Sequence, residues 1–565
     1  MKYALALAAA ALAVAAVLIA GHPNPDARMI ANWPLAGDTR DRSGNGHDAV
    51  NHGADLQAIG RDGRAGGAAG FNGRGAFLEI AARRSLDLGT GDFTLTAWVF
   101  TDRELDDVPG DIASQYDAAR RRGFRLSIKN NAGVTFNQAN YRQLQFGIDD
   151  NRASDWIDCG RPGKNSILAF ALAVHDGGLY AGTCEPGAGE VGRVYRYAGD
   201  AEWVDCGSPA PSNAITSMAA YDGKLYVGTG KYRLGGSALT ESENTHLGGR
   251  VFRYDGGTRW TDCGQLPAAE AVSGLVVYRG RLYAGSLYKP AGFFRYEGGT
   301  KWVDCGTPGG NRVEALGVYD GFLYATCYDG GRVYRFDGAA WTDCGQLGDP
   351  QINTQTYSLA VHAGRLYVGT WRSGRVYRMD ETADSDGRAT FAWIDVGRLG
   401  EELEVMGMLV HNGRLIAGTL PLAEVYEFDG QAAWRRLARL DLTPDVKYRR
   451  AWTMAEFQGK LFTSVLPSGR VFAHEVGKNV TSDRELTAGW RHVAAVKSAG
   501  RLELFVDGRS VARSESFNPD EFNLTSDQPI RLGFGANDYF RGRLSDMRIY
   551  RGALDAADIA RLAAP

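Results

Sequence analysis

The chain has 565 residues, with 63 Lys and Arg against 66 Asp and Glu, a formal net charge of −3. This near-neutral balance gives no indication of nucleic acid or an anionic membrane surface as a partner. Hydrophobic residues make up 44% of the chain, which excludes global disorder, and its 74 Gly and 25 Tyr favour short strands and tight turns over a helical bundle.

An apolar run from Ala4 to Ala20 follows Lys2, a pattern typical of an export signal. We therefore expect residues 1–28 to form a signal peptide, or an uncleaved N-terminal anchor, together with a linker. The run is just long enough to span a bilayer. Under either alternative the protein is secreted, periplasmic or at the cell surface, and a membrane is a partner only through an uncleaved anchor.

The segment 29–150 is incomplete as a domain and carries several distinctive phrases. These are Trp33–Leu35, Asp41–Gly46, Phe71–Gly73, Ser85–Leu88 and Phe93–Val99. The alternating run at Phe93–Val99 is typical of a strand.

The segment 151–477 is periodic. Trp recurs at positions 156, 203, 260, 302, 341, 393 and 434, and variants of Leu-Tyr-Val-Gly-Thr and Gly-Arg-Val-Tyr-Arg-Tyr recur between them. Each copy reads as four strands separated by Gly turns, and seven copies predict a seven-bladed β-propeller. The blade pattern resembles that of Kelch and galactose-oxidase-like propellers, although the Kelch double-Gly strand with spaced Tyr and Trp is not present in a clean form.

The register of the repeat predicts how the ring closes. The first Trp strand, 156–160, has no blade in front of it, and the last blade lacks a Trp strand. Pairing 156–160 with 469–474 would complete seven blades and remove the open edge. Five of the seven cysteines lie in the repeated Trp-x-Asp-Cys-Gly phrase on outer strands, and we expect buried thiols rather than disulfides.

The segment 478–565 supplies phrases that complement the first flank. They are Trp490–Ala494, Leu504–Gly508 and Gly542–Tyr550. Together the two flanks resemble one laminin-G-like, concanavalin A-type jelly roll, except that Ser545-Asp546 stands where that family usually has two acids. The predicted fold is therefore all-β, a concanavalin A-like sandwich split by an inserted seven-bladed propeller between a strand at 143–148 and one at 490–496.

The resemblance implies a carbohydrate or protein ligand and, in many such domains, one structural Ca²⁺. By resemblance the candidate Ca²⁺ ligands are Asp41 and Asp546, since the ion requires several oxygen ligands. The alternative is that Asp41 caps a turn and Asp546 accepts a backbone hydrogen bond.

The propeller mouth is the second candidate site. Residues just after the second strand of four blades are aromatic, and exposed rings stack on sugars, although they could equally be packed loop residues. Interblade loops add charged residues, which could bind an acidic sugar or be solvated rim charges. A long insertion in a regular repeat, such as the one at 230–249, is often functional. The predicted ligand-binding residues are Tyr232, Tyr288, Tyr328, Trp371, Arg312, Glu314, Glu404 and Arg449.

These features predict an exported, non-catalytic protein that binds a glycan or an extracellular protein ligand. Two alternatives stay open. One is a polysaccharide-active enzyme, a hydrolase or lyase, for which Glu314 and Glu404 would be the paired carboxylates in one pocket. The other is a structural surface protein, which predicts a propeller mouth plugged by apolar side chains.

Overall fold

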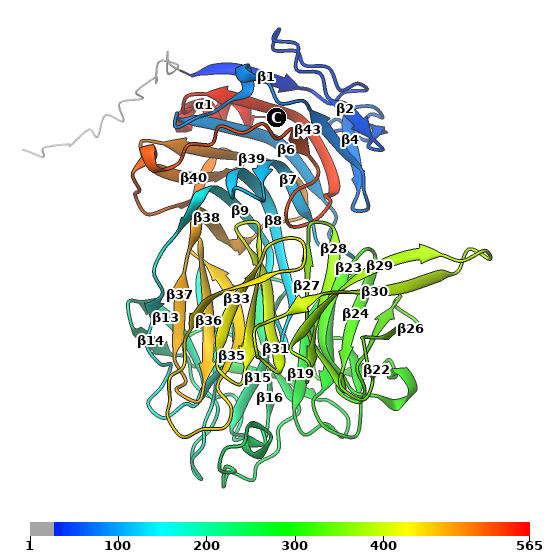
Figure 1. Ribbon diagram of the computed structural model, residues 1–565, viewed down its shortest axis with the longest axis vertical. Helices are drawn as coiled ribbons and strands as arrows, with labels where there is room; N and C mark the ends of the chain where they lie inside the picture. The colour runs from blue at the N-terminus through cyan, green and yellow to red at the C-terminus, as the bar shows by residue number, and fades with distance from the viewer. Residues whose placement is uncertain (1–26, 565) are drawn as a thin grey trace, which may run out of the picture.

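The computed structural model describes residues 27–564, so the predicted export segment and linker at residues 1–28 lie outside the described range except for their last two residues. The described chain is almost entirely β-structure, with a single α-helix, α1 (Ala556–Leu562). None of its helices is long and apolar enough to cross a membrane. Figure 1 shows a two-sheet sandwich seated on one end of a ring of smaller sheets.

The sandwich takes strands from both ends of the chain. Its first sheet comprises β3 (Asp55–Ala58), β4 (Ala68–Asn72), β43 (Arg541–Arg551), β6 (Phe93–Thr101), β39 (Gly489–Ser498), β40 (Arg501–Val506) and β41 (Arg509–Arg513), with β1 (Arg28–Trp33) paired to β43. Its second sheet comprises β2 (Val50–His52), β5 (Phe77–Ile80), β42 (Ile530–Leu532), β7 (Gly110–Asp117), β8 (Arg122–Val134), β9 (Asn137–Ala153) and β38 (Val476–Glu485). Because β6 lies between β43 and β39, neither flank could complete the core alone.

The segment between the flanks forms seven four-stranded antiparallel units. The first four are β11 (Leu168–His175), β12 (Gly178–Cys184), β13 (Val194–Gly199), β14 (Glu202–Asp205); β15 (Ala214–Tyr221), β16 (Lys224–Gly230), β17 (Arg250–Tyr254), β18 (Trp260–Gln265); β19 (Val272–Tyr278), β20 (Arg281–Ser286), β21 (Phe293–Tyr296), β22 (Trp302–Asp304); and β23 (Val313–Tyr319), β24 (Phe322–Cys327), β25 (Arg332–Phe336), β26 (Trp341–Gln346). The other three are β27 (Gln355–His362), β28 (Arg365–Trp371), β29 (Arg375–Ala383), β30 (Ala389–Arg398); β31 (Glu404–His411), β32 (Arg414–Leu420), β33 (Glu424–Phe428), β34 (Trp434–Arg439); and β35 (Arg450–Phe457), β36 (Lys460–Leu466), β37 (Val471–His474) with β10 (Ile157–Asp158).

The last unit joins the two ends of the inserted segment. Strand β10 pairs with β37, with Ile157 opposite Ala473 and Asp158 opposite Phe472. The predicted ring closure is therefore confirmed, as is the predicted all-β fold class, here a two-sheet sandwich joined to a propeller of seven blades.

The repeated Trp-x-Asp-Cys-Gly phrase links neighbouring blades. The indole Nε1 of Trp203 donates to the Cys159 carbonyl of the preceding outer strand at 2.8 Å, and equivalent bonds come from Trp260, Trp302, Trp341, Trp393 and Trp434. The Asp carboxylate accepts from the backbone N–H two residues later, as Asp158 does from Gly160 at 2.9 Å. All seven cysteines are free and six are buried, as predicted for structural thiols.

A long hairpin of the sandwich, β8 and β9, runs along the axis of the propeller (Figure 1). It contacts the innermost strand of every blade, namely β11, β15, β19, β23, β27, β31 and β35. The sequence predicted only a strand at 143–148 here, whereas β9 extends over Asn137–Ala153. The channel of the propeller is therefore filled by backbone and side chains of the other domain.

The tip of this hairpin satisfies backbone groups of the inner strands. Met218 N–H donates to Asn137 Oδ1 at 3.0 Å, and Leu275 N–H donates to the Phe136 carbonyl at 3.2 Å. The Phe136 ring is 1% exposed and lies among the rings of Phe170, Tyr357 and Trp452 at centroid distances of 5.9, 5.8 and 6.1 Å. Polar and aromatic contacts together fix the hairpin in the channel.

A buried ion pair anchors the middle of the hairpin. Lys129 Nζ lies 3.2 Å from Glu456 Oε2, and His411 Nδ1 lies 2.7 Å from Glu456 Oε1. Burial opposes ionisation of Glu456, but Lys129 and His411 hold the pKa of that carboxyl below its ordinary value. A charged carboxylate is thus kept inside the interface between the two folds.

The chain leaves the propeller through β38 rather than through the predicted strand at 490–496. Strand β38 pairs with β9, with Lys478 opposite Ile148. Its sequence is mostly polar, so it lacks the apolar alternation by which a strand is recognised, although most of its residues are buried.

Candidate functional site

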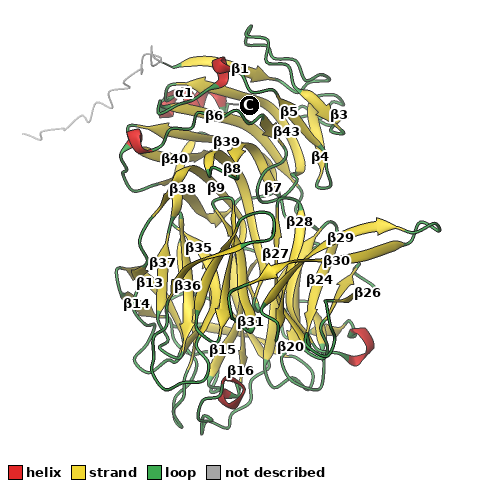
Figure 2. Ribbon diagram, in the orientation of Figure 1, coloured by secondary structure: helices red, strands yellow, loops and turns green. Residues whose placement is uncertain are grey.

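One face of the propeller is covered and the opposite face is open. The sandwich docks on the turns between first and second strands, where Arg279 N–H donates to the Leu105 carbonyl at 2.8 Å and Ala363 N–H to the Ala536 carbonyl at 2.9 Å. The loops after the second strands emerge at the other face. The short helix that follows β16, residues Leu234–Ser237, marks this remote end in Figure 2.

The open face contains a cavity of about 400 Å³. All four predicted aromatic residues line it: Tyr232, Tyr288, Tyr328 and Trp371. Two of them are also tied into the loops, since the Tyr232 hydroxyl lies 2.8 Å from Ser237 Oγ and the Tyr288 hydroxyl accepts from Arg233 N–H at 2.9 Å. The aromatic walls are therefore held in place before any ligand arrives.

The polar part of the cavity comes from the ends of the innermost strands. Gln355, Glu404 and Arg450 are the first residues of β27, β31 and β35, in three consecutive blades. Glu314 is the second residue of β23 in the blade before them. The propeller symmetry thus gathers four polar side chains from four blades into one cavity.

Two buried glutamates, Glu314 and Glu404, line this cavity. Glu314 is fully buried, and neither of its carboxyl oxygens has a hydrogen-bond partner among the described residues. Burial raises its pKa well above the ordinary value, an effect that Arg312 opposes and Glu404 reinforces. Burial also raises the pKa of Glu404 to about 7, although Arg450 opposes it. Buried polar groups without partners are rare in folded proteins, so Glu314 is a candidate for contact with a ligand.

Of the two predicted arginines, Arg312 lines the cavity and Arg449 does not. Arg312 pairs with Asp329 at 2.6 Å and stacks over the Tyr328 ring. Arg449, which was predicted to bind the ligand, is not among the residues that line the cavity. Its Nε donates to the Thr443 carbonyl at 2.6 Å, and the next residue, Arg450, lines the cavity instead. Neighbouring residues at the start of a strand point to opposite sides, so a one-residue offset changes which arginine enters the site.

Sequence reasoning missed several lining residues. Tyr357 enters from the same innermost-strand ends that supply the glutamates, Tyr448 precedes β35, and Arg233 comes from the insertion at 230–249. The length of that insertion was the available signal for Arg233. Gln355 and Tyr357 occupy positions in their blade that correspond to those of Glu404 and Glu314 in theirs. This correspondence within the repeat could have indicated both residues.

The tip of the hairpin packs against residues that line the cavity. Phe136 belongs to the apolar cluster that also contains Tyr232, Tyr357 and Trp452, with Trp371 packed against it. The structural-protein alternative expected apolar side chains to plug the propeller mouth, whereas the mouth contains a cavity with polar and aromatic lining.

The predicted calcium ligands are engaged elsewhere. Asp41 accepts from the backbone N–H groups of Asn32, Ser43 and His47 at 2.8–3.0 Å, and despite partial burial these bonds lower its pKa. Asp546 pairs with Arg548 at 2.7 Å. No group of three or more His, Cys, Asp or Glu residues suited to a metal occurs among residues 27–564. Asp41 is thus held by backbone N–H groups and Asp546 by Arg548, and a Ca²⁺ ligand role for either stays a prediction.

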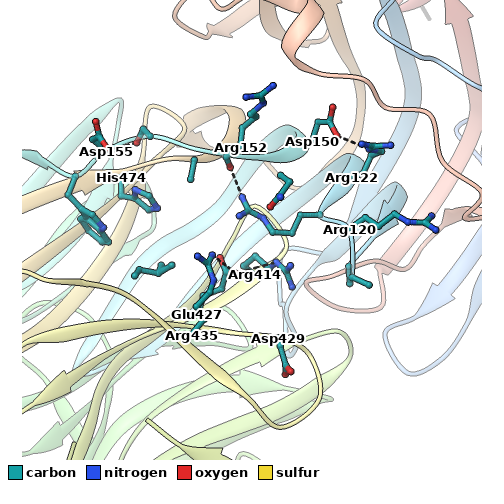
Figure 3. Close-up of a pocket in the computed structure, with 18 residues that line it drawn as sticks. Arg120, Arg122, Asp150, Arg152, Asp155, Arg414, Glu427, Asp429, Arg435 and His474 are labelled. Atoms are coloured by element: carbon teal, nitrogen blue, oxygen red, sulfur yellow. Dashed lines mark hydrogen bonds and ion pairs between the residues drawn. The ribbon is translucent and has the colours of Figure 1, made fainter. Parts of the chain in front are cut away.

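A larger cavity of about 1220 Å³ lies at the junction of sandwich and propeller (Figure 3). Most of its charged side chains already have partners: Arg122 pairs with Asp150 at 2.7 Å, and Arg435 pairs with Glu427 at 3.2 Å. Charges that are already paired with each other gain little from pairing with a ligand. Glu427 Oε2, Arg414 Nε and both ring nitrogens of His474 also have no hydrogen-bond partner among the described residues there, but Glu427 is ion-paired with Arg414 and Arg435. The propeller cavity is the stronger candidate, because both carboxyl oxygens of Glu314 lack a partner and no ion pair compensates them within residues 27–564.

Comparisons with known proteins support the sandwich assignment. A family model described as the concanavalin A-like lectin/glucanases superfamily matches residues 442–560. No curated protein sequence matches the chain. Similar solved structures include virginiamycin B lyase from Staphylococcus aureus, with 10% identity and a TM-score of 0.41 over 57% of this chain and 99% of that one. A GH74 xyloglucanase from Xanthomonas campestris has 15% identity and a TM-score of 0.39, covering 60% of this chain and 59% of that one.

Proposed function

We propose that this is an exported glycan-binding protein whose binding site is the open cavity of the propeller. The observation that carries the proposal is the combination, in one cavity, of aromatic walls and the buried carboxyl group of Glu314, which has no hydrogen-bond partner among the described residues. Its volume of about 400 Å³ lies within the range of roughly 300–1,000 Å³ typical of small-molecule sites.

The chemistry of the lining suits a sugar ring. The faces of Trp371 and Tyr328 offer apolar surface to the C–H face of a pyranose, and the carboxyl of Glu404 offers hydrogen bonds to its hydroxyls. A site that combines apolar walls with a few placed polar groups binds by excluding water and fixes orientation through hydrogen bonds.

A second candidate function is cleavage of the bound glycan. It is favoured by Glu314 and Glu404, which line the same cavity and both have raised pKa values. A carboxyl with a pKa near 7 suits general acid catalysis at neutral pH, and glycosidases use such a carboxyl with a second one. Release of reducing ends from soluble polysaccharides, lost in Glu404→Gln, would separate this function from binding alone.

We also propose that residues 29–150 and 478–565 form one domain and residues 151–477 the inserted one, with the sandwich holding the propeller rather than carrying the site. The hairpin β8–β9 supports this division of roles, because it contacts the innermost strand of every blade and its Phe136 packs against residues that line the cavity.

A glycan array on residues 29–565, run with Ca²⁺ and with a chelator, tests the proposal. We expect binding that survives chelation and is lost in Trp371→Ala. The matched control is Trp490→Ala, which removes an indole from the sandwich strand β39 and should leave binding intact. Loss of binding in Trp490→Ala with retention in Trp371→Ala would place the site in the sandwich and contradict the proposal.

A further inference from the structure

Arg450 is a buried cation in the propeller cavity that has no ion-pair partner within residues 27–564. Its side chain is 6% exposed, and its Nε and Nη1 have no hydrogen-bond partner within residues 27–564. The one acceptor near Nη2 is the Gly236 carbonyl at 3.5 Å. No carboxylate in the described part of the chain forms an ion pair with it. A buried guanidinium is costly without a counter-charge, so this arrangement calls for an anionic group from outside the chain.

The other arginines of the cavity are already paired. Arg312 pairs with Asp329 at 2.6 Å, and Arg233 pairs with Glu270 at 2.5 Å. Both also stack on aromatic rings of the wall, Arg312 on Tyr328 and Arg233 on Tyr288. The Arg450 guanidinium also lies over aromatic rings, 5.6 Å from the Tyr448 centroid and 5.9 Å from the Trp452 centroid. It differs from the other two in having no carboxylate partner within residues 27–564, so its charge is left for a ligand.

Neither neighbouring glutamate forms an ion pair with Arg450 in the described part of the chain. Arg450 acts on Glu404 only by opposing the effect of burial on its pKa, and the charged groups that act on Glu314 are Arg312, Glu404 and Asp329. Burial favours the neutral form of both carboxyls, so each can donate a hydrogen bond. A neutral carboxyl beside a guanidinium forms a pair of donors suited to one carboxylate.

We propose that the cavity is selective for an acidic sugar, in which the carboxylate of a uronic acid residue pairs with Arg450 and accepts a hydrogen bond from Glu404. This inference rests on the proposed function and specifies its ligand class. The pyranose ring would then lie against the wall that carries Trp371 and Tyr328, and the planar carboxylate would meet the planar guanidinium in a bidentate pair.

Calorimetry with chemically matched ligands tests this class. The probes are oligouronates, namely oligogalacturonate, oligoalginate and hyaluronan fragments, each compared with its carboxyl-reduced neutral counterpart. We expect at least one oligouronate to bind about tenfold to hundredfold more tightly than its reduced form, the range for one charge-assisted hydrogen-bonded contact. Sulfated dextran oligomers test whether any anionic sugar binds. If they bound as tightly as the oligouronates, the assignment of the ligand group to a carboxylate would be overturned.

Two variants test whether Arg450 is responsible for the preference for uronates. Arg450→Gln should abolish the preference for the uronate over its reduced form, whereas Arg449→Gln, which alters the adjacent arginine outside the cavity, should retain it. Equal binding of charged and reduced sugars by the unaltered protein would overturn the acidic-sugar inference while leaving glycan binding in place. A preference for amino sugars would also overturn it. Failure of every glycan, on the array and in calorimetry, would refute the proposed function itself.

Discussion

Replacing Phe136 by Ala tests whether the sandwich hairpin fills the propeller channel. The ring is 1% exposed, so its removal forfeits the transfer free energy of a buried Phe, about 1.5–3 kcal/mol, and leaves a cavity in its place. It also loses contacts with the rings of Phe170, Tyr357 and Trp452, and such aromatic pairs contribute about 0.5–1.5 kcal/mol. We expect the free energy of unfolding to fall by about 3–5 kcal/mol, the usual cost of a buried Phe→Ala change.

Urea unfolding followed by tryptophan fluorescence measures this loss. Trp452 is buried beside Phe136, so its emission should also shift to longer wavelength in the folded variant as water enters the vacated space. Leu442→Ala is the control, because that side chain is 73% exposed and should change stability by less than about 0.5 kcal/mol. A loss below about 1 kcal/mol for Phe136→Ala, with unchanged emission, would refute the packing of the hairpin tip in the channel.

Other predictions address the blades, the pH response and the metal. Trp203→Phe removes an indole bond to the preceding blade and should cost about 1 kcal/mol in urea unfolding, with no change in glycan affinity. Burial raises the pKa of Asp107 to about 8, so the stability linked to this group should fall as pH rises from about 4 to 8, and Asp107→Asn should flatten that part of the unfolding profile. Affinity for an oligouronate should weaken as pH rises through about 7, because Glu404 then becomes an anion facing the ligand, and calorimetry between pH 5.5 and 8.5 with Glu404→Gln as the pH-insensitive comparison checks this. Chelation of Ca²⁺ should leave the melting temperature unchanged, and a chelator-induced decrease that disappears in Asp41→Asn or Asp546→Asn would contradict the assignment of those carboxylates to hydrogen bonds and an ion pair.

The repeat was predictable because each of its residues has a local role. The Trp indole reaches the preceding outer strand, the Asp caps its own turn, and both recur at a spacing that a single chain reveals. Ring closure followed from counting strands. The four aromatic residues after the second strands followed from the same register, and they line one cavity as the propeller geometry requires.

The hairpin in the channel was not predictable in the same way. Its strands read as ordinary sandwich strands, and nothing local in the sequence shows that Asn137 and Gln138 accept bonds from inner strands of the propeller. Their clustering in an amide-rich stretch was the one hint. The choice between Arg449 and Arg450 also needed the structure, because it depends on the exact residue at which β35 begins.

A crystal structure of the protein with the tightest-binding glycan tests the central claim most directly. The account predicts electron density for a sugar in the propeller cavity, with its ring against Trp371 or Tyr328 and a polar group within hydrogen-bond distance of Glu404 or Arg450. Density for the glycan only on the sandwich or in the cavity at the junction, with the propeller cavity holding water, would contradict it.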